Sequence, residues 1–312
     1  MTELKNEKRY IYFKGEIMPE EDAKISILSP AVQYGVNVFA GIRCYFNKEF
    51  NQLYAFRLED HVERLLNSAK ILRFNLDQKI NFEYIKYNLL KVIKANDFRE
   101  DIYVRITLLL DGRGNWSSTE PIELIISPFP KARAFVDKDG ITACITTWER
   151  INDKTLPPRV KAGGNYLNSR LGQLEATSTG YDSAIFLNQE GKVAEGPGSC
   201  LFVIRKDKII TPPVTASILE SITRQSVITI TSNILNIDVI ERPIDRTELY
   251  IADEMFLCGT AIEITPVLCI DKIYVNNKIV GRITNKLRDI YFQIVRNTST
   301  ANLPNEWLSP IY

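Results

Sequence analysis

Histidine is nearly absent from this chain, which has 312 residues and a single histidine, His61. One histidine cannot build a metal site from several imidazoles, so we expect no metal centre of that kind. The same scarcity argues against a hydrolase that relies on a serine–histidine pair, because there a histidine acts as the base. We therefore expect other side chains to carry any chemistry.

An excess of charge of either sign is also missing. The sequence has 39 basic and 38 acidic residues and a formal net charge of +1. Proteins that bind nucleic acids or anionic membranes rely on surplus positive charge, so this composition predicts neither partner. The chain further lacks a long apolar run and a signal-peptide pattern, and we expect a cytoplasmic protein.

Cysteines in paired motifs are lacking as well. The chain has five cysteines without CxxC spacing, and an odd number cannot be fully paired within one chain. Most stand between apolar residues, as buried reduced thiols do: Cys44, Cys144, Cys200, Cys258 and Cys269. This usage also fits a reducing compartment.

What the chain does have is enough apolar sequence for one large or two ordinary domains, since 45% of its residues are hydrophobic. Apolar residues recur at helical spacing over residues 58–72 and 82–92. Between Ile102 and Leu110 they alternate in steps of two, which predicts a strand. Residues 10–18 predict a hairpin with its turn at Lys14-Gly15.

The proline-rich string Ser-Pro-Phe-Pro at residues 127–130 interrupts these patterns. Beyond it we expect a strand over residues 141–148, a helix that ends near Gly180, and hairpins over 183–195 and 201–210.

Strands and helices mixed in two blocks predict two α/β or α+β domains. We expect a small N-terminal domain over residues 1–130, a linker over 131–137 and a large C-terminal domain over 138–312.

Lys161 stands in the string Lys-Ala-Gly-Gly-Asn-Tyr-Leu, after two prolines and before apolar residues at helical spacing. A lysine at such a junction can be fixed in place and partly removed from water. Desolvation lowers the pKa of an amine, and only the neutral amine attacks a carbonyl. Taken alone, a lysine beside glycines is more often an ordinary surface residue.

Four further strings accompany it: YGVNVFAGIRCY at 34–45, EDHVERLLNSAK at 59–70, AEGPGS at 194–199 and CGTAIEITPV at 258–267. In order and spacing they resemble the class IV pyridoxal-phosphate (PLP) aminotransferases and, within that class, the branched-chain amino-acid aminotransferases. The resemblance covers nearly the whole chain. It implies a fold type IV enzyme whose two α/β domains hold PLP at their interface, with the PLP lysine in the C-terminal domain.

The resemblance implies a set of cofactor contacts. Lys161 would carry PLP as a Schiff base and then move the proton between Cα and C4′. Glu195 would keep the pyridine nitrogen protonated, and Tyr166 would donate a hydrogen bond to the phenolic oxygen of the ring. The phosphate would be held by Arg64, Ser221, Ile222, Thr223 and Thr260.

The resemblance also implies that residues 221–235 form a helix with Ser221 as its N-cap. Seven of the residues from 222 to 231 are β-branched and poor helix formers, so propensity alone leaves this segment ambiguous.

Substrate contacts are implied in the same way. Tyr103 and Arg105 share one face of their strand and would bind the substrate carboxylate, with help from the backbone of Thr260 and Ala261. The pocket for the substrate side chain would be lined by Tyr34, Phe39 and Gly41. Each of these residues alone has an ordinary structural explanation, as a capping, paired or core residue.

Four positions depart from the family pattern. Ala40 stands where a glutamate is common, Ile106 where a proline follows the arginine, Lys131 where bacterial relatives place tryptophan, and Ser221 where glycine is usual. We assign these changes to the pocket wall and the domain connection. The hypothesis that follows is that PLP chemistry is retained while the substrate range has shifted.

The implied activity is transfer of the amino group of a branched-chain or related hydrophobic L-amino acid to 2-oxoglutarate, giving a 2-oxo acid and L-glutamate. Alternatives on the same fold are a D-amino-acid or (R)-amine transaminase and a PLP lyase resembling 4-amino-4-deoxychorismate lyase. Arg105 and the GIRCY string favour the transferase over the lyase. A non-catalytic PLP-binding protein is a further alternative, against which the retained cofactor residues argue.

The family forms homodimers or larger assemblies, so a second copy of the chain is the expected partner. We assign the contact to the loop Asp111–Glu120, which contains Trp116.

Overall fold

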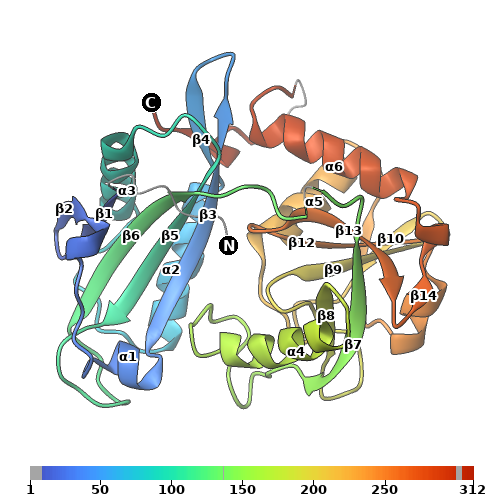
Figure 1. The fold of residues 1–312 in the computed structure, drawn as a ribbon, viewed down its shortest axis with the longest axis horizontal. Helices are drawn as coiled ribbons and strands as arrows, with labels where there is room; N and C mark the ends of the chain where they lie inside the picture. The colour runs from blue at the N-terminus through green and yellow to red at the C-terminus, as the bar shows by residue number, and fades with distance from the viewer. Residues whose placement is uncertain (1–8, 136, 300–303) are drawn as a thin grey trace. The chain divides into compact units, whose positions relative to one another are not determined.

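The computed structural model describes residues 9–299, apart from residue 136, and residues 304–312 (Figure 1). The described chain divides into two compact units. Unit 1 holds residues 9–132, 160–164 and 304–312, and unit 2 holds residues 133–159 and 165–299. Within the described residues, no helix is both long and apolar enough to cross a membrane.

Unit 1 is built on an antiparallel sheet of seven strands in the order β15-β4-β3-β5-β6-β1-β2. The strands are β1 (Tyr10–Phe13), β2 (Glu16–Pro19), β3 (Asn37–Asn47), β4 (Gln52–Phe56), β5 (Ile102–Leu110), β6 (Ile122–Pro130) and β15 (Leu308–Pro310). Its helices are α1 (Pro30–Tyr34), α2 (Leu58–Ile71) and α3 (Phe82–Asn96), with 3-10 helices at Glu20–Asp22 and Asn305–Trp307. The predicted first hairpin, both helices and the strand from Ile102 to Leu110 are confirmed.

Strands β3 and β5 divide their side chains between two faces of this sheet. Ala40 and Ile106 are cross-strand partners, and both lie in the apolar core with residues of α2 and α3. The next pair along the strands, Gly41 and Arg105, faces the opposite way because side chains alternate along a strand. One face of the sheet therefore builds the core, and the other is available for polar chemistry.

The segment around Lys161 belongs to unit 1, whereas the sequence predicted it in the C-terminal domain. Its apolar residues explain the difference, since Val160 and Ala162 are buried in the core of unit 1. Ala162 also forms an isolated antiparallel bridge with Val38 of β3. Residues 304–312 join unit 1 through β15, which pairs with β4.

Strand β6 continues through the prolines that were read as an interruption. Val104 pairs with Pro128 and Ile102 with Pro130, so β5 pairs along the whole strand. Among the described residues, the other neighbour, β1, shares the register pair Tyr12 and Ile126 with β6. The prolines lie beyond that pair, towards the end of β6, where a missing N–H group is tolerated.

Unit 2 contains an eight-stranded mixed sheet in the order β11-β10-β9-β12-β13-β7-β8, with β14 paired to β13. The strands are β7 (Ile141–Glu149), β8 (Ser183–Leu187), β9 (Cys200–Arg205), β10 (Lys208–Thr211), β11 (Val239–Glu241), β12 (Glu254–Gly259), β13 (Glu263–Ile270) and β14 (Ile273–Tyr274). The helices are α4 (Tyr166–Ser178), α5 (Ile222–Asn233) and α6 (Arg282–Val295), with 3-10 helices at Arg246–Ile251 and Asn276–Lys278. Both units mix helices and strands, as the predicted α/β class requires.

Helix α5 confirms the predicted helix in spite of its β-branched residues. Ser221 is the N-cap, and its Oγ accepts a hydrogen bond of 3.3 Å from the backbone N–H of Arg224. Val227 and Ile230 are fully buried, so packing outweighs the weak intrinsic propensity of this segment.

Candidate active site

Lys161 is held against strand β3 of unit 1 by its backbone. Its carbonyl oxygen accepts a hydrogen bond of 2.9 Å from the N–H of Phe39, and its own N–H donates one of 3.2 Å to Ser68 Oγ. The ammonium nitrogen Nζ lies 5.0 Å from the centre of the Phe39 ring. Hydrogen bonds of its N–H and its carbonyl thus fix the backbone of Lys161, and its amine lies over an aromatic face.

Helix α2 brings further polar groups to Lys161. Ser68, which anchors the Lys161 backbone, donates its hydroxyl to the carbonyl of Arg64 one turn earlier at 2.9 Å. His61 is 2% exposed, and its Nδ1 has no hydrogen-bond partner among the described residues. Burial, and then the positive charges of Arg64, Lys161 and Arg57, lower the pKa of His61 well below its usual value. The imidazole is therefore neutral beside several cations.

Phe39, Tyr103 and Arg105 gather on the polar face of the same sheet. The guanidinium carbon of Arg105 lies 4.1 Å from the centre of the Phe39 ring and 5.8 Å from that of Tyr103. Gly41 makes room for the Tyr103 side chain, because a Cβ at position 41 would lie 1.6 Å from the Tyr103 hydroxyl. Burial raises the pKa of Tyr103, an effect that Arg105 and Arg64 offset only in part, so its phenol remains a hydrogen-bond donor.

The four residues that depart from the family pattern lie in different places in the structure. Ala40 and Ile106 lie on the core face of the sheet, so their assignment to the pocket wall was wrong. Ser221 caps α5. Lys131, in contrast, lies on the polar face, where its Nζ is 4.7 Å from the centre of the Tyr103 ring.

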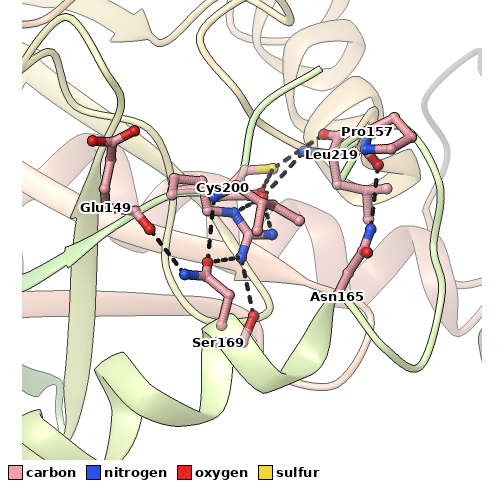
Figure 2. Close-up of polar contacts among 10 residues, drawn as sticks. Glu149, Pro157, Asn165, Ser169, Cys200 and Leu219 are labelled. Carbon is pink, nitrogen blue, oxygen red and sulfur yellow. Dashed lines mark hydrogen bonds and ion pairs between the residues drawn. The ribbon is translucent and has the colours of Figure 1, made fainter. Parts of the chain in front are cut away.

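In unit 2, Glu195 is a buried carboxylate whose two oxygens have different partners, of which Cys200 and Leu219 are labelled in Figure 2. Its Oε1 accepts two hydrogen bonds from Arg150, at 3.1 and 2.8 Å, and one of 3.2 Å from the N–H of Leu219. Among the described residues, its Oε2 accepts only the weak thiol donor of Cys200, at 3.7 Å. The charge of Arg150 compensates that of Glu195, while one oxygen keeps capacity for another donor.

Glu195 owes its position to the chain segment that follows β8. The N–H of Phe186 donates to the Glu195 carbonyl at 2.9 Å, and the N–H of Ala194 donates to the Phe186 carbonyl at 2.9 Å. The predicted second arm of this hairpin is therefore present, although it forms isolated bridges rather than a regular strand.

Tyr166 begins helix α4 and lies beside the glycine-rich loop after Glu195. A Cβ on Gly198 would be 3.8 Å from the Tyr166 hydroxyl, and one on Gly259 would be 3.1 Å from the carbonyl of Gly198. Thr260 and Ala261 follow at the tip of the hairpin formed by β12 and β13. The turn of Thr260, the loop of Gly198 and the ring of Tyr166 are thus neighbours.

Ser221, Ile222 and Thr223 open helix α5. The first backbone N–H groups of an α-helix have no partner within the helix and favour anions. Ile222 and Thr223 are 8% and 3% exposed, so these donors lie in a sheltered position.

Two comparisons decide the family. The family described as class IV amino-transferase matches residues 38–270, which is well over half of the chain. A probable branched-chain-amino-acid aminotransferase of Aquifex aeolicus (strain VF5) is 40% identical over 305 residues, covering 97% of each chain.

This chain belongs to the class IV aminotransferases.

Solved structures agree with this assignment. The branched-chain amino acid aminotransferase of Thermobaculum terrenum in its PLP form has a TM-score of 0.91 and 40% identity, covering 98% of this chain and 99% of that one. The branched-chain aminotransferase of the archaeon Thermoproteus uzoniensis, solved with norvaline, has a TM-score of 0.90 and 39% identity, covering 98% of this chain and 100% of that one. The resemblance seen in the sequence and the predicted fold class are confirmed.

The residues that the sequence predicts for the site fall into two groups, one in each unit. Unit 1 brings together Lys161, Arg64, Phe39, Gly41, Tyr103 and Arg105. Unit 2 holds Tyr166, Glu195, Ser221, Ile222, Thr223, Thr260 and Ala261. Tyr34 stands outside the first group: it is 48% exposed, and its ring packs edge-on against Trp116 at 5.9 Å.

The residues of unit 2 fit PLP chemically. The observation that tests the fit is Glu195 Oε2, a buried carboxylate oxygen that accepts only a thiol, because a protonated pyridine nitrogen is a donor of the kind that it lacks. The sheltered start of α5 is likewise suited to a phosphate.

Sequence reasoning missed Arg150, the residue that secures Glu195. Arg150 lies just after β7, and its Nη1 donates to Asn168 Oδ1 at 3.2 Å and to Ser169 Oγ at 3.1 Å on α4. No motif or periodicity marks it, since an arginine after a strand is usually exposed. Only its 7% exposure and its partners mark it as a candidate for the site.

Proposed function

We propose that this class IV aminotransferase uses PLP to transfer the amino group of a branched-chain or related hydrophobic L-amino acid to 2-oxoglutarate, giving a 2-oxo acid and L-glutamate. The observation that carries the proposal is the buried Glu195 carboxylate, held by Arg150 on one oxygen and open to a donor on the other. The names of the relatives support the substrate class, because the Aquifex aeolicus protein is called a probable branched-chain-amino-acid aminotransferase.

PLP would be held by the residues that the sequence resemblance implies. Lys161 would hold its aldehyde carbon, and Glu195 its ring nitrogen. Tyr166 would donate to the ring oxygen. The phosphate would be held by Arg64, by the backbone N–H groups and hydroxyls at the start of α5 (Ser221, Ile222 and Thr223), and by Thr260.

When bound, PLP supplies a ring that withdraws electrons from the substrate Cα. Glu195 would keep the proton on the ring nitrogen, and Arg150 would hold Glu195 in place. The amine of Lys161 would take the proton from the substrate Cα and deliver it again, because a positioned amine can serve as general base and then as general acid. The backbone bonds of Lys161 to Phe39 and Ser68 fix its root, so that movement would be made by the side chain alone.

Substrate binding would rely on Tyr103 and Arg105, on the polar face of the unit 1 sheet. Tyr103 is a buried donor, and Arg105 is a cation that stacks on Phe39. A phenol and a guanidinium together suit a carboxylate. The backbone N–H groups of Thr260 and Ala261 would add donors to the same group, and Phe39 and Gly41 would border the substrate side chain.

The test is reduction of the PLP-loaded protein with borohydride, followed by mapping of the labelled peptide. We expect the pyridoxyl group on Lys161 and a change in the visible absorbance when L-leucine, L-valine or L-isoleucine is added to unreduced protein. Lys161→Ala should abolish turnover, whereas Lys154→Ala, which removes an exposed lysine, should not. A label on another lysine, or full turnover by Lys161→Ala, would refute the assignment.

The same titration separates the alternatives on this fold. A D-amino-acid or (R)-amine transaminase would respond to those compounds instead of L-amino acids, and a lyase would release pyruvate from aminodeoxychorismate. Bound PLP that responds to no amino acid would indicate a non-catalytic protein.

We also propose that the chain forms a homodimer or larger homo-oligomer through the surface around Tyr34 and Trp116. Apolar side chains are exposed there, with Ile27 at 76%, Trp116 at 73% and Val32 at 50%. Such a patch is typical of a surface that another protein covers. Light scattering should give a smaller mass for Trp116→Glu than for the unaltered protein, and an unchanged mass would place the contact elsewhere.

The cytoplasmic location is a proposal as well. All five cysteines are buried and unpaired by disulfides, which fits a reducing compartment. Fractionation of the producing cell would test it, and recovery outside the cytoplasm would contradict it.

A further inference from the structure

The hairpin of β12 and β13 in unit 2 closes with a strained backbone at Glu263. Gly259 and Glu263 are register partners, and the three residues between them, 260–262, form the loop. Glu263 has a φ of 56°, in the left-handed region, where glycine is favoured because a Cβ crowds the backbone. A residue other than glycine keeps such a conformation only where its surroundings hold it.

The side chain of Glu263 is held by an arginine from a distant part of the chain. Glu263 is 2% exposed, and its Oε2 accepts a hydrogen bond of 3.1 Å from Arg133 Nε. Arg133 lies where the chain enters unit 2, and its guanidinium carbon is 3.8 Å from the centre of the Phe292 ring on α6. A carboxylate and an aromatic ring together orient a guanidinium, so Arg133 is a fixed partner for Glu263.

The loop between the two strands is held at both ends. At its start, a Cβ on Gly259 would lie 3.1 Å from the carbonyl of Gly198, so the backbone there packs closely against the loop after Glu195. At its end, the hydroxyl of Thr265 donates to the carbonyl of Ile262 at 2.7 Å, beside the left-handed backbone of Glu263. The direction of the backbone N–H groups within the loop depends on these contacts.

We propose that Glu263 is a positioning residue for substrate binding. Its ion pair with Arg133 holds the left-handed backbone, and that backbone sets the direction of the N–H groups of Thr260 and Ala261. The proposal rests on the proposed function, which assigns these two N–H groups to the substrate carboxylate. Glu263 acts through the loop and not on the reacting atoms, so its loss should weaken substrate binding and leave the proton transfer by Lys161 intact.

The first experiment is steady-state kinetics of Glu263→Gln in the PLP-loaded enzyme, because glutamine keeps the shape of the side chain without its charge. We expect KM for L-leucine to rise about tenfold and kcat to stay within about twofold, the pattern of a lost binding interaction. Arg133→Met should have the same effect, and Arg133→Lys, which keeps the charge, should retain most of the binding. Arg282→Met breaks the exposed ion pair with Asp207 in unit 2 and is the control that should change neither constant.

The double variant Arg133→Met/Glu263→Gln tests whether the two residues act as one unit. If they do, its KM should be no higher than that of the more affected single variant. A KM that rises by the product of the two single effects would show that they act independently, which overturns the proposal. A fall in kcat with an unchanged KM would overturn it as well.

Two further measurements on the PLP-loaded protein do not depend on turnover. Calorimetric titration with 4-methylpentanoate, which has the carbon skeleton of leucine without the amino group, should show binding weakened about tenfold in Glu263→Gln. Amide hydrogen exchange over residues 258–265 should be faster in the same variant. A lower unfolding temperature with unchanged binding and exchange would give Glu263 a purely structural role and refute the proposal.

Glu263→Gly separates the side chain from the backbone conformation. Glycine accepts the left-handed backbone without strain but does not fix it, so this variant should bind 4-methylpentanoate no better than Glu263→Gln does. Normal binding by the glycine variant would mean that the conformation alone is sufficient, and the ion pair would then have no part in positioning.

The two proposals fail in different ways. If the unaltered protein responds to no amino acid, the proposed function is wrong, and hydrogen exchange over residues 258–265 still decides whether the ion pair holds the loop. If the unaltered protein transaminates leucine and Glu263→Gln has the same KM, only the inference about Glu263 is wrong.

Discussion

Replacement of Arg150 by methionine should destabilise unit 2 strongly. Arg150 donates two hydrogen bonds to Glu195, one to Asn168 and one to Ser169, and both charged partners are less than 10% exposed. In Arg150→Met, Glu195 keeps only the N–H of Leu219 and the thiol of Cys200. Removal of one partner from a buried ion pair costs about 3–5 kcal/mol, because the other charge remains buried without compensation.

Thermal unfolding of the protein without PLP measures this cost, because the ion pair lies wholly within unit 2. For a domain of this size the loss corresponds to a fall in Tm of roughly 10 °C. The matched control is Arg159→Met, which breaks the exposed pair of Arg159 with Glu220 and should cost no more than about 1 kcal/mol.

The double variant Arg150→Met/Glu195→Gln separates charge from packing. It leaves no unpaired charge, so it should be more stable than Arg150→Met alone. The reasoning is refuted if Arg150→Met unfolds at the same temperature as Arg159→Met, or if the double variant loses as much as the two single losses combined.

Two further predictions concern unit 1. In Gly41→Ala, the new Cβ would lie 1.6 Å from the Tyr103 hydroxyl and displace it. KM for L-amino acids should therefore rise about tenfold, while PLP still labels Lys161. An unchanged KM would exclude Tyr103 from carboxylate binding. In the folded protein the pKa of His61 lies well below its usual value near 6.5. Below about pH 6.5, His61 therefore takes up a proton in the unfolded chain more readily than in the folded protein. Stability should therefore fall as the pH drops below about 6.5, a decline that His61→Leu should lack. The single histidine resonance in NMR spectra should not titrate between about pH 6 and 8, and titration there with the usual value would contradict the burial argument.

Much of the fold follows from local patterns in the sequence. The alternation from Ile102 to Leu110 predicts β5 with its bounds and its two faces, and the apolar stripe over residues 58–72 predicts α2. The helix from Ile222 to Asn233 did not follow from propensity, because its β-branched residues are stabilised by burial that no local pattern shows. The prolines at 128 and 130 were misleading for the same reason, since their tolerance depends on pairing with β5, which no local pattern shows.

Motifs in the sequence predict some of the site residues but not how these residues are arranged. The Lys161, Glu195 and Tyr166 motifs could be located, but their division between two compact units could not, because Val160 and Ala162 join the core of unit 1 through contacts far away in sequence. Arg150 carries no motif and was missed, and its importance rests on a partner 45 residues away. Ala40 and Ile106 were assigned to the pocket wall because they depart from the family pattern within two of its motifs. Neighbours on a strand point to opposite faces, however, and these two face the core.

That division of β3 and β5 bears on how such an enzyme changes during evolution. Substitutions at Phe39, Gly41, Tyr103 or Arg105 alter what the protein recognises while Val38, Ala40 and Ile106 continue to hold it together. An insertion or deletion of a single residue within either strand is different in kind, because it would exchange the two sets and bury the arginine in place of the isoleucine. New specificities on this scaffold should therefore arise by replacement within strands of constant length.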